Sequence, residues 1–311
     1  MPRNSIDPDK LSKAWLTLYK QEKIPLDEKI ELSQTIIKNA LKTSKNPSIS
    51  WSGGKDSTVL LHMVRQFLPD IPTIFVDIDC LFPETREYVY DIRDKWELNL
   101  YVVKSDEYSF DSLTQKYGYP IFGKNIANNV ERARRTNNLR KQLTPFELFL
   151  VKNNANISTK CSQFLLEKPC KKKELELHCD LKFIGLRALE SRSRVRLWAD
   201  YGDLYHVKDY FGKKKSILKC NPISIWTESN IWDYFYRYNI PICKIYNMGY
   251  QRNGCWTCAM AIRNGQLNRL KNYNIDLYNS LIYKSDMGVE IRRLMNLLET
   301  EKNYRKYIVL P

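Results

Sequence analysis

The chain has 311 residues, of which 43% are hydrophobic and 27% are charged. This length suits one large α/β domain with additions or two smaller domains, and the composition excludes disordered, fibrous and membrane-embedded proteins. The 50 Lys and Arg residues outnumber the 35 Asp and Glu residues, which gives a net charge of +15. Such an excess suggests a polyanionic partner, most often nucleic acid, although a lysine-rich proteome would produce the same balance.

The compartment expected from the sequence is the cytoplasm. No run approaches eighteen apolar residues, and the first residues lack the apolar stretch of a signal peptide, so we expect no membrane association. Eight cysteines in a reducing compartment argue against a disulfide framework. They are therefore buried hydrophobic residues, catalytic thiols or metal ligands. The spacing of the cysteines must distinguish among these three roles.

Hydrophobic periodicity predicts strands that alternate with helices along much of the chain. The predicted elements, in chain order, are helices over 9–45, a strand at 48–51, a helix at 58–67, a strand at 73–77, a helix from Pro83, strands at 98–103 and 181–185, two short strands within 205–220, a helix from Thr227 to Tyr238, and helices after Gly265. Alternation of this kind predicts an α/β fold with a mainly parallel sheet flanked by helices. We divide the chain into a helical N-terminal extension (1–46), a nucleotide-binding domain with a cysteine site (47–262) and a C-terminal helical segment (263–311).

The loop at 52–57 has the composition of a phosphate-binding loop. Its residues, in order, are Ser52, Gly53, Gly54, Lys55, Asp56 and Ser57. Glycines let backbone N–H groups approach an anion closely, and the following helix directs its positive end at the same place. The spacing differs from that of the Walker loop. It resembles the PP-loop of the ATP-pyrophosphatase superfamily, which implies an adenine nucleotide α-hydrolase-like fold, ATP with Mg²⁺ as the nucleotide, and cleavage between the α and β phosphates.

Further segments narrow the resemblance to the PAPS reductase family over roughly residues 48–260. The segment at 75–85 is similar to the family's adenosine-binding strand and loop, and Gly185-Leu186-Arg187 resembles its Gly-x-Arg segment. The resemblance implies that Asp77 orients the adenosine and that Arg187 faces the reacting phosphate, with Lys55 as the second catalytic residue. From the residues alone, the less favoured alternatives are a helix or loop cap for Asp77 and a solvated face for the arginines near 187.

The cysteines suggest a metal site. Cys255 and Cys258 have the spacing of metal or cluster ligands in a Gly-led loop. Cluster-bearing relatives have a Cys-Cys pair upstream, and here the matching residues are Cys161 and Ser162. Cys161, Cys255 and Cys258 are thus the predicted ligands of a [4Fe–4S] cluster, with zinc as the alternative. The fourth ligand is left open, as Cys170, Cys220, Cys243 or none, while Cys80 and Cys179 are predicted to be ordinary buried cysteines.

The complete phosphate loop favours ATP over a sulfonucleotide. Sulfonucleotide reductases use a cysteine near their C-terminus, and no cysteine follows Cys258 in these 311 residues. The Gly-Cys-Trp-Thr-Cys segment most resembles the DndC- and SspD-type proteins of DNA phosphorothioation. This resemblance implies an enzyme that adenylates an oxygen of a nucleic acid, DNA rather than tRNA, so that sulfur from a cysteine desulfurase replaces it, with other phosphorothioation subunits as possible partners. The alternatives are sulfonucleotide reduction, sulfate adenylylation and tRNA thiolation.

Overall fold

The computed structural model describes residues 8–136, 143–212, 215–258 and 265–307, and the predicted boundary at 262 lies outside them. These residues form two compact units. The first unit holds the described residues up to Val76, Glu84–Val103 and Cys170–Lys244, and the second holds Asp77–Pro83, Lys104–Pro169 and the described residues from Ile245 onward. None of the described helices is long and apolar enough to cross a membrane.

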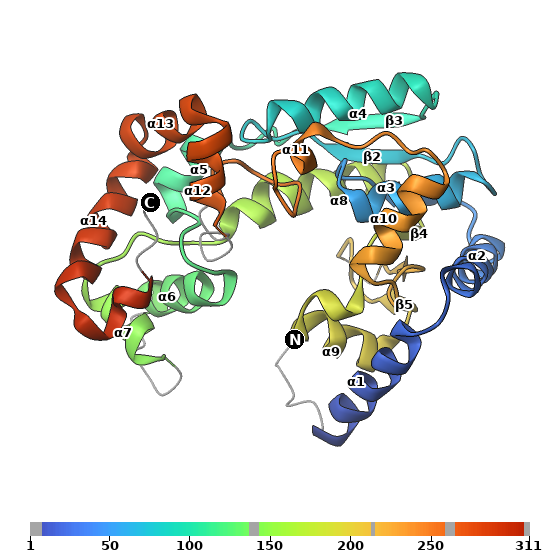
Figure 1. The fold of residues 1–311 in the computed structure, drawn as a ribbon, viewed down its shortest axis with the longest axis horizontal. Helices are drawn as coiled ribbons and strands as arrows, with labels where there is room; N and C mark the ends of the chain where they lie inside the picture. The colour runs from blue at the N-terminus through green and yellow to red at the C-terminus, as the bar shows by residue number, and fades with distance from the viewer. Residues whose placement is uncertain (1–7, 137–142, 213–214, 259–264, 308–311) are drawn as a thin grey trace. The chain divides into compact units, whose positions relative to one another are not determined.

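The first unit is built on a six-stranded sheet with the order β3-β2-β1-β4-β6-β5 (Figure 1). The strands are β1 (Pro47–Ser50), β2 (Thr73–Val76), β3 (Leu100–Val103), β4 (Leu181–Ile184), β5 (Leu204–Val207) and β6 (Ile217–Cys220). All neighbouring pairs are parallel except the edge pair of β5 and β6. The predicted fold class, a mainly parallel sheet flanked by helices, is confirmed.

Buried apolar residues explain why these short segments form the centre of the sheet. Ile49 of β1 lies opposite Thr73 of β2 on one side and Phe183 of β4 on the other, and all three are buried. Parallel strands covered on both faces have continuous buried runs of this kind. The helices of this unit are α1 (Pro8–Glu22), α2 (Leu26–Lys42), α3 (Lys55–Arg65), α4 (Pro83–Lys95), α8 (Lys168–Glu176), α9 (Arg192–Tyr201) and α10 (Glu228–Arg237), of which α4 and α8 begin just outside it.

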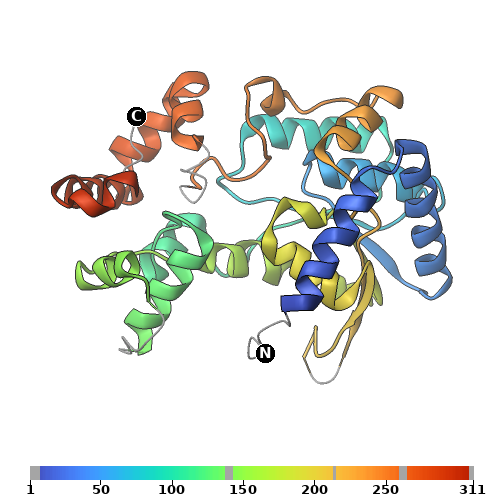
Figure 2. The ribbon, with the colours of Figure 1, turned by 60° about the horizontal axis from the view of Figure 1, so that its bottom comes forward.

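Helix packing places the first turn of α3 beside the start of α10. Helix α3 packs against α2 and α10, and α1 packs against α9, as Figures 1 and 2 show. The order of strands reverses between β1 and β4, because the chain proceeds from β1 to β2 and β3 on one side and places β4 and β6 on the other. In open α/β sheets, ligands bind at the carboxyl ends of the strands at such a reversal. The loops after β1 and β4 both start there.

The second unit is helical. Its helices are α5 (Phe110–Tyr117), α6 (Lys124–Thr136), α7 (Pro145–Lys152), the π-helix η1 (Ser162–Glu167), α11 (Lys244–Asn247), α12 (Gln266–Tyr273), α13 (Ile275–Lys284), α14 (Asp286–Thr300) and the 3₁₀ helix η4 (Lys302–Tyr307). Helices α6 and α7 pack together, and α13 packs against α12 and α14. The elements predicted from the sequence include none over 104–160, and α5 and α7, with eight residues each, are too short to show a clear helical period.

Candidate functional site

The predicted phosphate loop joins β1 to α3. Helix α3 begins at Lys55 rather than at Thr58, so Lys55, Asp56 and Ser57 form its first turn. Gly53 has a φ of 71°, a left-handed conformation that glycine adopts without strain. The Ser57 hydroxyl donates to the Gly54 carbonyl at 2.9 Å, and hydrogen bonding also links it to Ser52. The loop is therefore held in one shape at the positive end of an eleven-residue helix.

Gly185 allows the chain after β4 to pack directly on this loop. A Cβ atom at Gly185 would lie 2.8 Å from the Cα of Ser57 and 2.9 Å from its backbone nitrogen. Only glycine fits without moving one of the two backbones. This close approach brings Arg187, two residues further on, to the first turn of α3.

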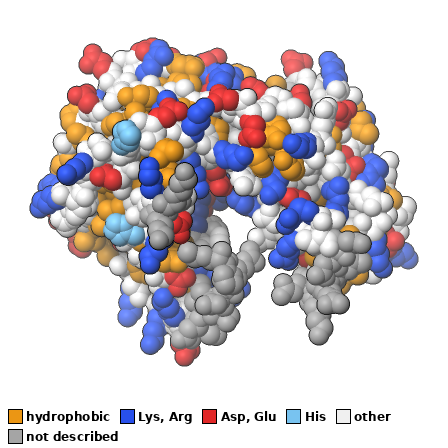
Figure 3. Space-filling view, turned by 180° about the vertical axis from the view of Figure 1, so that it is seen from behind, with side chains coloured by type: hydrophobic (Ala, Val, Ile, Leu, Met, Phe, Trp, Pro, Cys, Tyr) orange, Lys and Arg blue, Asp and Glu red, His pale blue; other side chains and the backbone are white. Residues whose placement is uncertain are grey.

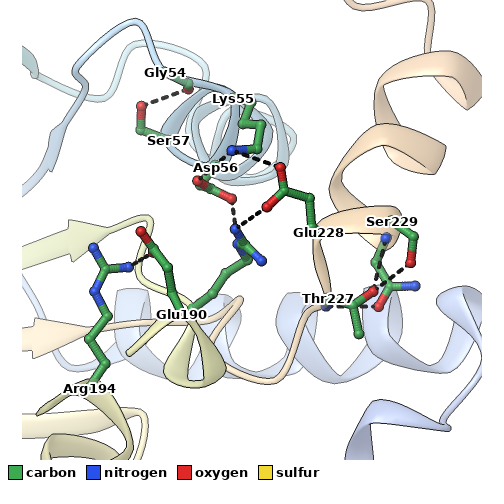
Figure 4. Close-up of polar contacts among 11 residues, drawn as sticks. Gly54, Lys55, Asp56, Ser57, Glu190, Arg194, Thr227, Glu228 and Ser229 are labelled. Atoms are coloured by element: carbon green, nitrogen blue, oxygen red, sulfur yellow. Dashed lines mark hydrogen bonds and ion pairs between the residues drawn. The ribbon is translucent and has the colours of Figure 1, made fainter. Parts of the chain in front are cut away.

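Two cations and two carboxylates meet beside the loop (Figure 4). Lys55, which is 3% exposed, has its Nζ 3.3 Å from a carboxylate oxygen of Glu228 and 3.8 Å from one of Asp56. The Arg187 guanidinium donates to Asp56 at 2.6 Å and to Glu228 at 3.0 Å. Because Glu228 is half-exposed, it can leave both cations when a more highly charged anion arrives. The structure thus brings Lys55 and Arg187 together, and their catalytic roles stay predictions.

Replacing Glu228 by glutamine is expected to tighten nucleotide binding about two- to fivefold. The change removes a negative charge from beside Lys55 and Arg187, and pairs this exposed are worth at most about 1 kcal/mol. Calorimetric titration with ATP measures the effect, and Glu87→Gln on α4, whose exposed carboxylate pairs with Lys244, is the matched control. Weaker binding by Glu228→Gln would show that this carboxylate supports the nucleotide instead.

Asp77 follows β2 directly and is the first residue of the second unit. Its side chain is 3% exposed and lies 3.2 Å from the Nζ of Lys104, which follows β3. Asp77 is therefore a buried carboxylate with a cationic partner. Its assignment to the adenosine stays a prediction.

The predicted metal ligands Cys161, Cys255 and Cys258 all lie in the second unit. Cys161 precedes η1, and Cys258 donates its backbone N–H to the Cys255 carbonyl at 3.1 Å, which closes a tight turn. Burial raises the pKa of the Cys161 thiol to about 11, and negative charge on Cys258 and Cys80 adds to this rise. Cys80 was expected to be an ordinary buried residue, but its side chain is hydrogen-bonded to that of Cys255.

The Cys80–Cys255 hydrogen bond affects the two thiols in opposite directions. It lowers the pKa of Cys80 against the effect of burial, and it raises the pKa of Cys255 well above its ordinary value. A cavity of about 410 Å³ in the same unit is lined by Cys80, Trp256 and Thr257, together with residues of α5, α13 and α14. Cys80 therefore borders a pocket, open to solvent, that is large enough for a small molecule.

The family of the chain follows from a match to known sequences. The model of the phosphoadenosine phosphosulfate reductase domain matches residues 46–261. The chain belongs to this family. The phosphoadenosine 5'-phosphosulfate reductase of Buchnera aphidicola is 31% identical over 206 residues, which are 66% of this chain and 67% of the relative. The same-named enzyme of Xylella fastidiosa is 24% identical over 208 residues, 66% of this chain and 69% of that one.

Comparison with solved structures finds one of a similar name. The phosphate complex of phosphoadenylyl-sulfate (PAPS) reductase from Candida auris has a TM-score of 0.48 and 17% identity, covering 81% of this chain and 97% of that chain. The named relatives in the family are enzymes of sulfonucleotide chemistry, so the chain belongs to an enzyme family.

Two residues that contact the predicted site residues of this chain were not predicted from the sequence. Glu228 was assigned no role, although it contacts both Lys55 and Arg187. Its position just after Thr227, at the start of a capped helix, gave no sign of this, because the pairing depends on how α10 packs against α3. The contact of Cys80 with the Cys255 loop was missed because a single cysteine outside a ligand motif is usually buried for its hydrophobicity.

Proposed function

We propose that the chain is an ATP pyrophosphatase, which binds ATP through residues 52–57 and cleaves it between the α and β phosphates. The observation that carries this proposal is the complete Ser-Gly-Gly-Lys-Asp-Ser loop between β1 and α3, at the reversal point of the sheet, with Lys55 and Arg187 beside it. The loop N–H groups and the positive end of α3 supply donors for the β and γ phosphates. A complete loop of this kind can bind a pyrophosphate group, which ATP has and a sulfonucleotide lacks.

The reaction would proceed by displacement at the α phosphorus. An acceptor oxygen forms a bond to that phosphorus, the bond to the bridging oxygen breaks, and pyrophosphate leaves with the electron pair. Lys55 holds the departing phosphates, and Arg187 stabilises the charge that develops at the α phosphate. Asp77 would accept hydrogen bonds from the ribose or the adenine amine.

The carboxylate of Asp56 in the loop suits Mg²⁺. Mg²⁺ at nucleotide sites is usually held by one or two carboxylates together with phosphates and waters, and Asp56 supplies one such carboxylate at the loop. When bound, Mg²⁺ would neutralise part of the phosphate charge. Removing it with a chelator should therefore abolish turnover.

For the acceptor, our finer proposal is a nucleic acid, with DNA phosphorothioation as the process. A thiol reductant would release sulfide-level sulfur from the desulfurase persulfide. This sulfur would form a bond to the phosphorus whose oxygen is adenylated, and AMP would leave with the electron pair of the broken P–O bond. The net charge of +15 supports a polyanionic acceptor. On the face in Figure 3, Lys and Arg side chains are spread among acidic ones rather than gathered in one patch. The names of the relatives give no support to DNA as the acceptor.

The second candidate is sulfonucleotide reduction, and the named relatives favour it more directly than they favour DNA chemistry. Both reductases described above are similar to this chain over two thirds of their length. In this case residues 52–57 would bind the phosphate of APS or PAPS, and Arg187 would face the sulfonate. Sulfite would be the product.

One set of assays distinguishes the two candidates. The full chain is incubated with ATP and Mg²⁺, alone and with DNA, tRNA or sulfate, and in parallel with APS or PAPS and a dithiol reductant. Pyrophosphate release that DNA or tRNA stimulates would support the proposal. Stimulation by sulfate alone would show that the acceptor is sulfate and that the enzyme activates sulfate. Sulfite release from APS or PAPS without pyrophosphate release from ATP would overturn it in favour of the second candidate.

A further inference from the structure

The helical second unit contains a pocket that the proposed nucleotide chemistry does not use. Its volume is about 410 Å³, and it is open to solvent. The first turns of α5 and α14, the end of α13 and two loops form its walls. Pockets of this volume commonly bind small organic molecules. All of its lining residues belong to the second unit, so the pocket is a property of that unit alone.

Aromatic side chains form part of the pocket wall. Phe110, Tyr119 and Trp256 all line it. The backbone holds two of them in place, because the Trp256 N–H donates to the Cys80 carbonyl at 3.0 Å and the Tyr119 N–H donates to the Asn156 carbonyl at 2.8 Å. Aromatic rings bury apolar ligand surface, and their faces attract organic cations. The wall therefore suits an aromatic or apolar body, with or without a positive charge.

The charged residues of the pocket give it a net negative charge. Its exposed acidic residues are Asp79, Asp111 and Asp286, and its described cationic residue is Lys284. Asp111 and Asp286 lie in the first turns of α5 and α14, whose positive ends each offset about half a charge. After Lys284 is counted, about one negative charge remains. In a chain with a net charge of +15, such a pocket favours a ligand that carries one positive charge.

The arrangement of the three carboxylates favours an organic cation over a metal ion. In the part of the chain that the structure describes, no ion pair joins any of them to a lysine or arginine, and the Gln115 amide, which donates to Asp286 at 3.1 Å, is a neutral partner. The described His, Cys, Asp and Glu residues include no group of three or more that is arranged to hold a metal ion. The carboxylates thus line the pocket separately, as contacts for a larger cation.

The hydroxyl of Tyr119 independently indicates a ligand. Tyr119 is only 7% exposed, yet its hydroxyl makes no hydrogen bond to any residue within the described ranges. Buried tyrosine hydroxyls usually have a hydrogen-bond partner. Burial raises the pKa of Tyr119, and the negative charges of Asp286, Glu290 and Asp111 raise it further. The hydroxyl therefore stays neutral in a negative field, and its oxygen can accept a hydrogen bond from an ammonium group.

We propose that this pocket binds a small organic cation, an amine carried on an aromatic or apolar body. The ammonium group lies near Asp111, Asp286 and the Tyr119 hydroxyl, and the body packs against Phe110 and Trp256. The negative charge of the pocket repels an anion, and a neutral ligand of the same shape leaves the carboxylates without a charged partner. The inference goes beyond the proposed nucleotide chemistry, because residues 52–57 belong to the other unit.

The first test compares three ligands that share one aromatic body. The full chain is titrated calorimetrically with tryptamine, with the neutral alcohol tryptophol and with the anion indole-3-propionate. We expect saturable binding of tryptamine that is about tenfold tighter than that of tryptophol, because a hydrogen bond to a charged group is stronger than one between neutral groups. Indole-3-propionate should bind more weakly than both. This comparison uses the wild type, so it does not depend on whether a variant folds.

The second test uses two conservative variants and a matched control. Asp286→Asn should weaken tryptamine binding about tenfold and leave tryptophol binding unchanged, while Tyr119→Phe should weaken tryptamine binding about two- to tenfold. Asp276→Asn is the control, since Asp276 is an exposed acid in the first turn of α13 that does not line the pocket. It should bind tryptamine like the wild type. A wild type that does not bind tryptamine, equal affinities for the three indoles, or wild-type tryptamine affinity in both pocket variants would each overturn the proposal.

Discussion

Replacing Lys55 by alanine is expected to lower the rate of pyrophosphate release from ATP by about 100- to 1000-fold, the usual cost of losing one preorganised group that stabilises developing charge. Lys55 is buried in the first turn of α3 and lies within 4 Å of two carboxylates at the phosphate loop. A steady-state assay of pyrophosphate with saturating ATP measures the loss. The fold should survive, because Arg187 still pairs with Asp56 and Glu228 in the variant.

The control for this prediction is Lys38→Ala. Lys38 is an exposed lysine on α2 that contacts the ring of Phe67, so its removal tests for a general effect of lost positive charge. The control should release pyrophosphate at the wild-type rate. If Lys55→Ala also released pyrophosphate at that rate while remaining folded by circular dichroism, the loop would have no part in catalysis.

Replacing Gly185 by alanine is expected to destabilise the first unit by about 1–3 kcal/mol, the usual cost of forcing an extra carbon into a packed site. The added Cβ would lie 2.8 Å from the Cα of Ser57, and neither backbone can yield without moving the phosphate loop. We therefore expect a lower midpoint in denaturant together with ATP affinity reduced at least tenfold. Urea unfolding and calorimetric titration measure the two effects.

Gly123→Ala is the matched control for this change. A Cβ at Gly123 would meet nothing within 4 Å, so we expect a change within about 0.5 kcal/mol. Wild-type stability and wild-type ATP affinity in Gly185→Ala would show that the chain after β4 does not fix the loop.

Local sequence patterns predicted the sheet well. The strands expected at 48–51, 73–77 and 181–185 lie within a residue or two of β1, β2 and β4, because each is a short apolar run bounded by turns. The start of α3 was placed three residues late. Gly54 caps that helix in an extended conformation, and Lys55 to Ser57 already belong to its first turn, which the glycine-rich pattern had suggested was loop.

Pairings between distant segments could not be predicted in this way. The loop residues 52–57 are adjacent in the sequence and could be grouped from it, but the contact of Glu228 with Lys55 depends on the packing of α10 against α3, which no local pattern encodes. Cys80 likewise pairs with Cys255 through a bridge between two loops that lie far apart in the chain. No local pattern favours Cys170, Cys220 or Cys243 as a fourth thiol, and all three belong to the first unit.

The central claim is that residues 52–57 bind the β and γ phosphates of ATP, and the most direct test compares the affinities of ATP and AMP. Calorimetric titrations of both nucleotides, with Mg²⁺, are run on the wild type and on Lys55→Ala. We expect the wild type to bind ATP at least about tenfold more tightly than AMP, a difference of about 1.4 kcal/mol. We also expect this difference largely to disappear in Lys55→Ala. Equal affinities in the wild type, or a preference for ATP that Lys55→Ala retains in full, would show that residues 52–57 do not bind the β and γ phosphates.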